Sequence, residues 1–437
     1  MYEKIPLTAY AKVNPPLNSR LPKPDCEVSF IPMQDVSDGG DWSHRQTKKI
    51  LSISSGYTAF QEGDILFAKI TPCMENGKGT HAVGLVNGVG FGSTEFHVLR
   101  AEKEASPRFI FHLCNSRELR QAAEVQMTGS AGQKRVPTDF FSKFLVTRLN
   151  RGEQQAIAAV LDTMDEAIRQ TETVIAKLQQ VKAGMLHDLL THGLDENGEL
   201  RDPTQHPGQF KDSPVGRIPK DWDIVPLERK AEITSGITLG NPPQGSGTIE
   251  LPYLRVANVQ DGYLDLSEIK KIRIYKKDIE RFALRKGDVL MNEGGDYDKL
   301  GRGAVWDGQV EPCLHQNHVF RVRPIAGLLD SNFLDAVSGS HYGKGYFLLS
   351  SKQSTNLASI NSTQLKNFPI PCPEINEQRA IVATISGVDL TYEQEKTELR
   401  KLKRLKQGLM NDLLTGTTRV PQHLQADKVT VADTKRA

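Results

Sequence analysis

The chain has 437 residues, of which 38% are hydrophobic and 25% are charged. These proportions exclude an intrinsically disordered chain, and the length allows about two or three domains. With 55 Lys and Arg against 53 Asp and Glu, the formal net charge is only +2, so any nucleic-acid surface must come from local clustering of basic residues.

The five cysteines are scattered without a Cys-x-x-Cys pair, which argues against a disulfide framework and against a zinc knuckle. The N-terminal segment lacks an apolar signal core, and no apolar run approaches the roughly 20 residues that cross a bilayer. The expected location is therefore the cytoplasm, where a reducing environment keeps such thiols free.

Short apolar runs between Gly, Pro and Asn residues predict strands in both halves of the chain. In the first half the strands are predicted at 28–31, 65–70, 82–86 and 96–99, with a helix over 107–126. In the second half they are predicted at 253–256, 288–291, 303–306 and 318–322, with a helix near 331–338. Each half is therefore expected to contain an α+β domain of about 150 residues.

The chain contains an internal repeat with an offset of 224 residues. Without a gap, residues 153–191 and 377–415 share sixteen of thirty-nine positions. At the same offset the matches include Gly63-Asp64 with Gly287-Asp288, Gly79 with Gly303, Phe96 with Phe320, Phe109 with Phe333 and Phe144 with Phe368. Other segments differ, such as 37–57 against 260–281 and 69–78 against 292–302, so the repeat predicts one scaffold with divergent loops.

A heptad pattern predicts a long helix in each copy. In the first copy the apolar heptad pattern runs through Ile157, Leu161, Met164, Ile168, Thr171, Ile175, Leu178, Lys182, Met185 and Leu189. Adding 224 gives Ile381, Ile385, Val388, Tyr392, Glu395, Leu399, Leu402, Lys406, Leu409 and Leu413. Each helix would be roughly 58 Å long. Because an apolar face of this length needs a partner, the two helices are expected to pair as an antiparallel coiled coil with internal pseudo-twofold symmetry.

These patterns divide the chain into six predicted parts. Two similar α/β domains occupy 1–150 and 217–374, and the long helices occupy 151–192 and 375–416. A linker rich in Asp, Gly, Pro and Gln covers 193–216, and a C-terminal tail covers 417–437.

Two similar domains joined by long helices predict contacts with two sites on one long ligand. Duplex DNA fits this prediction, because paired modules recognise half-sites at matching spacing. Since the loops of the two copies differ, the two half-sites are expected to differ as well. The predicted target is an asymmetric, bipartite sequence with an unrecognised spacer.

Several motifs carry a resemblance to a known family. They are the segment GRIPKDWDIVPLERKAEITSG at 216–236, the Gly-Asp-aliphatic-Leu runs that begin at Gly63 and Gly287, the run Gly-Ser-Thr-Glu-Phe at 92–96, and the helix ends Asp-Leu-Leu-Thr at 188–191 and 412–415. Glu153-Gln154 and Glu377-Gln378 resemble the Glu-Gln pair that opens the conserved helices of that family. Over nearly its whole length the chain resembles the specificity subunits of type I restriction-modification enzymes.

The resemblance implies two target recognition domains on a subunit that has no catalytic site. It also implies binding to two methyltransferase subunits along the helices, and to restriction subunits in the full complex. S-adenosylmethionine, ATP and magnesium would belong to these partners, and no cofactor is expected on this chain. The second copy departs from the first at 292–300, which replaces the strand end at Lys69, and at His318-Val319, which replaces the element with Glu95.

Candidate DNA contacts are Arg, Lys, Asn and His side chains on the divergent loops, because such groups bind phosphates or base edges. The candidates are Arg45, Lys48, Lys49, Lys69, Lys78, Lys134, Arg135, Arg255, Asn258, Asn292, Lys299, Arg302, Asn317, His318 and Lys352. The alternative for each is a solvated surface charge or a turn residue.

Candidate subunit-binding residues are Glu153, Gln154, Lys182, Glu377, Gln378 and Lys406. The two lysines occupy heptad core positions, where lysine fixes register, marks a partner face, or extends its amine to water. The two glutamates have the alternative role of helix-start residues that the helix dipole favours.

Three kinds of string imitate catalytic or ligand-binding motifs. Asn14-Pro15-Pro16 and Asn241-Pro242-Pro243 resemble the loop of amino methyltransferases but lack its aromatic residue, and the glycine run at 88–92 precedes a strand. Cys313, His315 and His318 are spaced for a metal but are better explained as alternation along a strand. A self-contained DNA methyltransferase and a coiled-coil protein scaffold remain the alternative functions.

Overall fold

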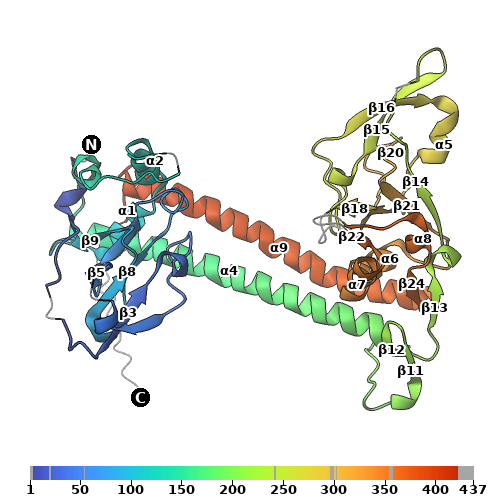
Figure 1. Cartoon of the computed structure of the whole chain (residues 1–437), viewed down its shortest axis with the longest axis horizontal. Helices are drawn as coiled ribbons and strands as arrows, with labels where there is room; N and C mark the ends of the chain where they lie inside the picture. The colour runs from blue at the N-terminus through green and yellow to red at the C-terminus, as the bar shows by residue number, and fades with distance from the viewer. Residues whose placement is uncertain are drawn as a thin grey trace. The chain divides into compact units, whose positions relative to one another are not determined.

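The computed structural model describes residues 3–18, 21–53, 55–130, 132–240, 243–295, 300–301, 303–353 and 358–421. The chain divides into two compact units (Figure 1). Unit 1 comprises Met1–Glu172 with Thr397–Ala437, and unit 2 comprises Thr173–Lys396. Each unit therefore contains one globular domain and a part of each long helix.

Unit 1 contains ten strands and three short helices among its described residues, followed by the long helix α4. The strands are β1 (Lys4–Pro6), β2 (Ala11–Val13), β3 (Glu27–Ile31), β4 (Gln46–Lys49), β5 (Thr58–Gln61), β6 (Ile65–Ala68), β7 (Gly79–His81), β8 (Val89–Gly92), β9 (Phe96–Ala101) and β10 (Leu145–Thr147). The helices are α1 (Pro107–Cys114), α2 (Arg117–Val125), α3 (Phe140–Lys143) and α4 (Arg151–Thr191).

After the second part of α4, unit 2 continues with a hairpin and then with a domain whose main strands and helices follow an order similar to that of unit 1. Its strands are β11 (Phe210–Ser213), β12 (Gly216–Pro219), β13 (Asp223–Pro226), β14 (Ala231–Ser235), β15 (Thr248–Leu254), β16 (Lys270–Tyr275), β17 (Val289–Asn292), β18 (Gly294–Gly295), β19 (Gly303–Val305), β20 (Leu314–His315), β21 (Val319–Pro324), β22 (Lys352–Gln353), β23 (Ala358–Ser359) and β24 (Pro369–Cys372). Its helices are α5 (Ile279–Phe282), α6 (Ser331–Gly339), α7 (His341–Ser350), α8 (Ser362–Lys366) and α9 (Ile375–Leu414).

The two domains share their sheet topology. The order β2-β9-β6-β7 in unit 1 matches β14-β21-β17-β19 in unit 2, and β4-β3-β8 matches β16-β15-β20. The parallel pairing of β3 with β8 recurs between β15 and β20, where Ser29 faces Gly90 and Tyr253 faces Leu314. The predicted α+β class with an internal repeat is confirmed.

Strand register corrects one detail of the repeat. Phe96 lies opposite Ala68 in unit 1, and the residue opposite Asn292 in unit 2 is Val319. Phe96 therefore corresponds to Val319, and the ungapped match with Phe320 is wrong. The second copy is one residue shorter between Leu314 and Val319, because the offset of 224 still holds at Leu314.

Repeated ion pairs brace the two central sheets. Asp64 accepts hydrogen bonds from Nε and Nη2 of Arg100, both at 2.8 Å, and Asp288 accepts the same pair from Arg323 at 2.6 and 2.8 Å. Asp64 and Asp288 are buried. The Gly-Asp motif therefore provides a buried carboxylate that holds the neighbouring strand, and the preceding glycines adopt positive φ in the turn.

The long helices α4 and α9 pair in antiparallel fashion within each unit (Figure 1). In unit 1, Lys406 pairs with Asp165; in unit 2, Lys182 pairs with Asp389, and Gln179 donates to Tyr392 at 2.8 Å. The heptad positions are buried or half-buried along both helices, as the predicted coiled coil requires. The expected pairing of the helices is confirmed.

The segment 193–216, predicted as a linker without structure, contains part of a hairpin. Phe210–Ser213 pairs with Gly216–Pro219, and Phe210 and Leu194 are buried. The order arises from packing of apolar side chains that are too sparse to give a periodic sequence pattern. The predicted tail at 417–437 lies mostly outside the described residues, which end at 421.

Each unit has its own main hydrophobic core. In unit 1 the core joins the helices α1, α2 and α3 to the start of α4 and the end of α9; in unit 2 it joins α6 and α7 to the opposite ends of these helices. Each domain is thus fixed to a helical pair by apolar packing. No described helix is both long and apolar enough to cross a membrane.

Candidate nucleic-acid interface

The basic residues before and on β4 lie on an edge strand of the unit 1 sheet. Arg45 donates to the carbonyl of Val83 at 3.0 Å and lies over the Trp42 ring, while the Nζ of Lys48 lies 3.7 Å from the centre of the Phe30 ring. Arg45 and Lys48 therefore already make contacts within the domain. Lys49 is exposed and makes no ion pair with any described residue.

The equivalent edge strand of unit 2, β16, carries basic residues that the sequence analysis missed. Lys271, Arg273 and Tyr275 alternate outward while Ile272 and Ile274 turn inward. A groove of about 1020 Å³ beside this strand is lined by all five residues from 271 to 275, together with Glu250 and Asp278. The alternation of basic and aliphatic residues over 270–275 was the available signal, and interleaved basic and aromatic side chains suit a nucleic-acid backbone.

The residues that follow β6 and β17 lie at equivalent positions, and the acidic and basic residues are exchanged between the two copies. In unit 1, Lys69 and Glu95 are joined by a backbone hydrogen bond of 2.9 Å; in unit 2, Glu293 and His318 are joined by one of 3.0 Å. His318 Nδ1 also lies 2.5 Å from the Glu293 carboxylate. In both copies an acidic residue therefore faces a basic one. The basic residue follows the strand β6 in unit 1, whereas the acidic residue follows the equivalent strand β17 in unit 2.

Arg135 completes this cluster in unit 1. Its Nε and Nη2 donate to the two carboxylate oxygens of Glu95, both at 2.9 Å. The hydrogen bond from Arg135 lowers the pKa of Glu95, and the nearby Lys69 ammonium acts in the same direction. The structure therefore brings together the candidates Lys69 and Arg135 around one ionised carboxylate.

Two further candidates in unit 1 are Lys78 and Lys134. The Nζ of Lys78 donates to the carbonyl of Met33 at 3.3 Å, which leaves the ammonium with further donors. Lys134 is exposed next to Arg135, and its carbonyl accepts from the backbone of Thr71.

Three candidates in unit 2 have structural roles. Asn258 is only 3% exposed, and its amide donates to the carbonyls of Asp265 and Glu268 at 2.8 and 2.9 Å. Asn292 is 2% exposed and donates to Val259, while the half-buried Arg255 donates to Glu268. This corrects the expectation that Asn258 and Asn292 contact DNA, because their amides hold a loop together inside the domain.

Of the four remaining candidates in unit 2, two lie within the described residues. Asn317 and Lys352 have accessible side chains, since Asn317 is half-buried and Lys352 is exposed. Lys299 and Arg302 lie outside the described residues.

Gln154 and Gln378 fasten each long helix to its own domain. The Oε1 of Gln154 accepts from the backbone N–H of Ser106 at 2.8 Å, and its Nε2 donates to the carbonyl of Leu149 at 2.9 Å. Gln378 accepts from Asp330 and donates to Pro373 at the same two distances. Both glutamines are 0% exposed, which corrects the expectation that they face a partner subunit.

The neighbouring glutamates differ between the copies. Glu153 forms a capping box with Asn150, as the helix-start alternative predicts. Glu377 instead accepts hydrogen bonds from Arg201 at 2.6 Å, from the N–H of Leu194 at 2.8 Å and from the Trp222 indole at 3.1 Å. Glu377 therefore anchors the segment that follows α4, so its carboxylate is occupied within unit 2.

Lys182 and Lys406 form symmetry-related ion pairs. Their partners Asp389 and Asp165 are themselves separated by the offset of 224 residues. These pairs lie across the coiled coil within each unit, where they favour a single register.

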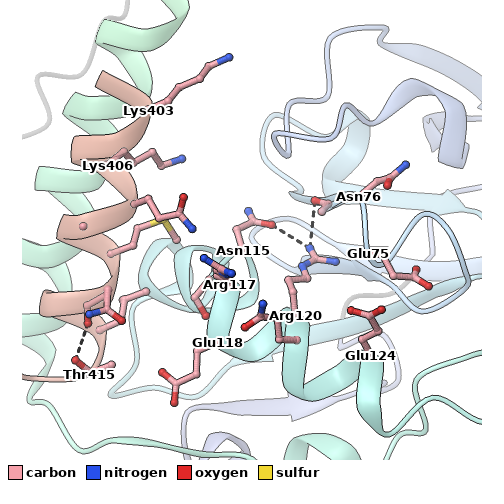
Figure 2. A pocket seen from close by; sticks show the side chains of 18 residues that line it. Glu75, Asn76, Asn115, Arg117, Glu118, Arg120, Glu124, Lys403, Lys406 and Thr415 are labelled. Atoms are coloured by element: carbon pink, nitrogen blue, oxygen red, sulfur yellow. Dashed lines mark hydrogen bonds between the residues drawn. The ribbon is translucent and has the colours of Figure 1, made fainter. Parts of the chain in front are cut away.

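A groove of about 740 Å³ lies between α2 and the end of α9 in unit 1 (Figure 2). Lys403, Lys406 and Arg117 provide positive charge there, and Glu118 and Glu124 provide negative charge. The buried Arg120 donates to Asn115 at 3.0 Å, and burial lowers its pKa to about 10 (Figure 2). Arg120 braces the loop that follows β6, since it also donates to the carbonyl of Met74 at 3.0 Å.

The strings that imitate catalytic motifs have structural explanations. Asn14 accepts from the backbone of Val98 and donates to His97, while Asn241 and Pro242 lie outside the described residues. Gly90 packs against the Phe60 ring, where a Cβ atom would come within 2.2 Å. His315 is buried against the carbonyl of Val319, and among the described residues the group with metal-binding proximity is instead His112, Asp162 and Asp165.

Comparisons with known proteins agree with this architecture. Residues 219–404 match the family model described as the type I restriction modification DNA specificity domain. The chain is 37% identical to the EcoEI specificity subunit of Escherichia coli, with 94% of this chain and 82% of that protein aligned. It is 26% identical to the EcoAI specificity subunit of the same species, over 94% and 81% of the two chains.

The S subunit of the type I system from M. genitalium has a similar fold, with a TM-score of 0.53 at 14% identity. That likeness covers 95% of this chain and 96% of the solved chain. Because the identity to the EcoEI subunit extends over most of both proteins, this chain belongs to the specificity subunits of type I restriction-modification enzymes, which are non-catalytic and confer DNA target specificity.

Proposed function

We propose that the chain recognises a bipartite, asymmetric DNA target, with one half-site contacted by each domain. The observation that carries this proposal is the repetition of one sheet scaffold with different side chains at equivalent positions. Lys69 and Glu95 correspond to Glu293 and His318, and the outward residues of β4 differ from those of β16. Equivalent surfaces with different hydrogen-bonding groups favour different base sequences.

The proposed partners are duplex DNA, two methyltransferase subunits along α4 and α9, and restriction subunits in the full complex. S-adenosylmethionine, ATP and magnesium would be bound by those subunits rather than by this chain, and the assembly would act in the cytoplasm. The methyltransferase alternative for this chain alone is weaker, because Asn14 uses its amide to hold the β9 strand.

The first experiment is co-expression of the chain with its methyltransferase subunit, followed by long-read mapping of methylated adenines. A split motif with one modified adenine in each half supports the proposal. Methylation by the chain without a partner would establish an enzyme, and the absence of both complex and methylation would favour a protein scaffold.

A domain exchange tests the division of labour. Residues 1–150 are replaced by the corresponding domain of another family member, and the expected result is one changed half-site with the other retained. A change in both half-sites would contradict modular recognition by two separate domains.

The role of the helices as a spacer is tested by deleting one heptad from each. Deleting 168–174 and 397–403 retains the pairs of Lys406 with Asp165 and of Lys182 with Asp389. Seven residues of helix correspond to about 10 Å, or about 3 base pairs of DNA. The expected motif has a spacer about 3 base pairs shorter, and an unchanged spacer in an active complex would contradict the proposed role.

A further inference from the structure

A third groove, of about 670 Å³, lies in unit 2 between α6 and the paired parts of α4 and α9. Its charged side chains are Lys182, Asp261, Asp335, Lys344 and Asp389. Asp389 pairs with Lys182, and Asp261 pairs with Lys344 at 2.6 Å. The Asp335 carboxylate makes no hydrogen bond or ion pair with any residue that the structure describes, so the groove contains one uncompensated acid.

The equivalent place in unit 1 contains an arginine from the same chain. At the offset of 224, Arg108 corresponds to Asn332, Phe111 to Asp335, and Asp162 to Ser386. The Arg108 Nε donates to Asp162 at 2.6 Å, and its guanidinium lies 4.3 Å from the centre of the Phe111 ring. A guanidinium therefore fills this space in unit 1.

In unit 2 the same space is open, because Asn332, Asp335 and Ser386 all line the groove. The residues that line the unit 1 groove of Figure 2 do not include Arg108, Phe111 or Asp162. The two copies thus differ in how this space is used: unit 1 fills it with its own Arg108 guanidinium, and unit 2 leaves it open beside the Asp335 carboxylate.

We propose that the groove between α6 and the paired helices of unit 2 binds the guanidinium group of an arginine from a partner protein, with Asp335 as its counter-ion. Charge complementarity supports a cationic occupant, because the groove has three carboxylates and two ammonium groups. Arg108 supports a guanidinium in particular, since the same scaffold already accommodates one. The identity of the partner as a methyltransferase subunit rests on the proposed function, but the guanidinium site does not.

The electrostatics of the groove agree with this occupant. Burial raises the pKa of Asp335 to about 7, and the charges of Asp261 and Asp389 act in the same direction while Lys182 opposes them. Lys344 also lines the groove, paired with Asp261. A bound guanidinium would favour the ionised carboxylate, so binding should strengthen as the pH rises through 7.

The partner-independent test uses L-arginine amide as the probe. At pH 8 the probe should raise the Tm of the unaltered chain and should have a smaller effect on the Asp335→Asn variant, in which the counter-ion is neutral. The exposed Asp212 on the β11–β12 hairpin provides the matched control, Asp212→Asn. Equal responses of the unaltered chain and Asp335→Asn would overturn the site.

A second variant supplies the cation internally. Asn332→Arg places a guanidinium at the position equivalent to Arg108. This substitution should raise the Tm more when Asp335 is present than when it is combined with Asp335→Asn. The same variant should also abolish the response to L-arginine amide. An equal gain in both backgrounds would show that the new arginine does not use Asp335.

Binding to the purified methyltransferase subunit then tests the partner. Asp335→Asn should weaken the complex by about 30-fold or more because it removes the counter-ion of the bound guanidinium. Asn332→Arg should weaken it to a similar extent because its own guanidinium occupies the site, and Asp212→Asn should leave the affinity unchanged. If the unaltered chain does not bind the subunit, the proposed function fails and the probe experiment alone decides the site. If all variants bind equally, the proposed function stands and this inference is overturned.

Discussion

The outward basic residues of β16 provide the sharpest test of DNA contact, because they form no ion pair with described residues. The perturbation is the double variant Lys271→Ala, Arg273→Ala. If each cation neutralises one phosphate, the slope of log K against log salt should fall in magnitude by about 1.8. Between 1 M and 0.15 M salt, this slope change corresponds to about 30-fold weaker binding at the lower concentration.

The assay is fluorescence anisotropy of labelled duplex DNA, titrated with the chain in complex with its methyltransferase partner at several salt concentrations. The matched control is Arg217→Ala, Lys220→Ala, which removes the same charge from the hairpin region of unit 2, where both side chains are exposed. An unchanged slope for the β16 variant, or an equal change in the control, would refute the assignment of this strand to the DNA surface.

Three further predictions follow from buried or charge-exchanged groups. Gln154→Ala and Gln378→Ala should each lower the free energy of unfolding by about 2–4 kcal/mol in urea titrations, because each leaves a buried carbonyl and a buried or half-buried N–H unpaired. Asp335→Asn should raise the Tm at pH 8 but not at pH 3. The pKa of Asp335 in the folded chain, about 7, exceeds the ordinary value of 3.8, so the contribution of this carboxyl group to folding stability is fully present below pH 3.8 and is lost as the pH rises through 7. Exchanging the pair through Glu293→Lys and His318→Glu should change one half-site of the methylated motif and leave the other unchanged.

The controls for these predictions use neighbouring exposed residues. Gln155→Ala and Arg379→Ala alter the helices beside the buried glutamines and should change stability by less than about 0.5 kcal/mol. A loss as large as that of the glutamine variants would contradict the anchoring role. A constant difference in Tm between Asp335→Asn and the unaltered chain across pH would contradict the raised pKa, and a change in both half-sites would contradict the assignment of Glu293 and His318 to one domain's contacts.

The repeat and the long helices could be predicted from the sequence because they depend on regular spacing. Heptad positions such as Ile157 and Leu161 are local features of one helix, and the offset of 224 preserves them in Ile381 and Ile385. The Gly-Asp motifs were also recognisable, although the arginine partner of each buried aspartate became visible only in the folded sheets.

Tertiary structure decided which polar residues remain available for a ligand. Asn258 and Asn292 belong to residue types that contact bases, but backbone carbonyls brought close by folding use their amide donors. Gln154 was expected at a partner surface, and the packing of α4 on its domain buries it. Sequence spacing contains no measure of such burial, because the atoms that cover these side chains come from distant segments.

The sequence by itself determined that one scaffold is used twice and that long amphipathic helices accompany each copy. Only the tertiary structure showed that the backbone of Lys69 bonds to Glu95 and that of Glu293 to His318, and that an arginine fills in unit 1 the space that Asp335 faces in unit 2. The physical reason is that periodicity fixes which face of a helix or strand is buried, whereas charge pairing depends on distances between residues that only the folded chain brings together.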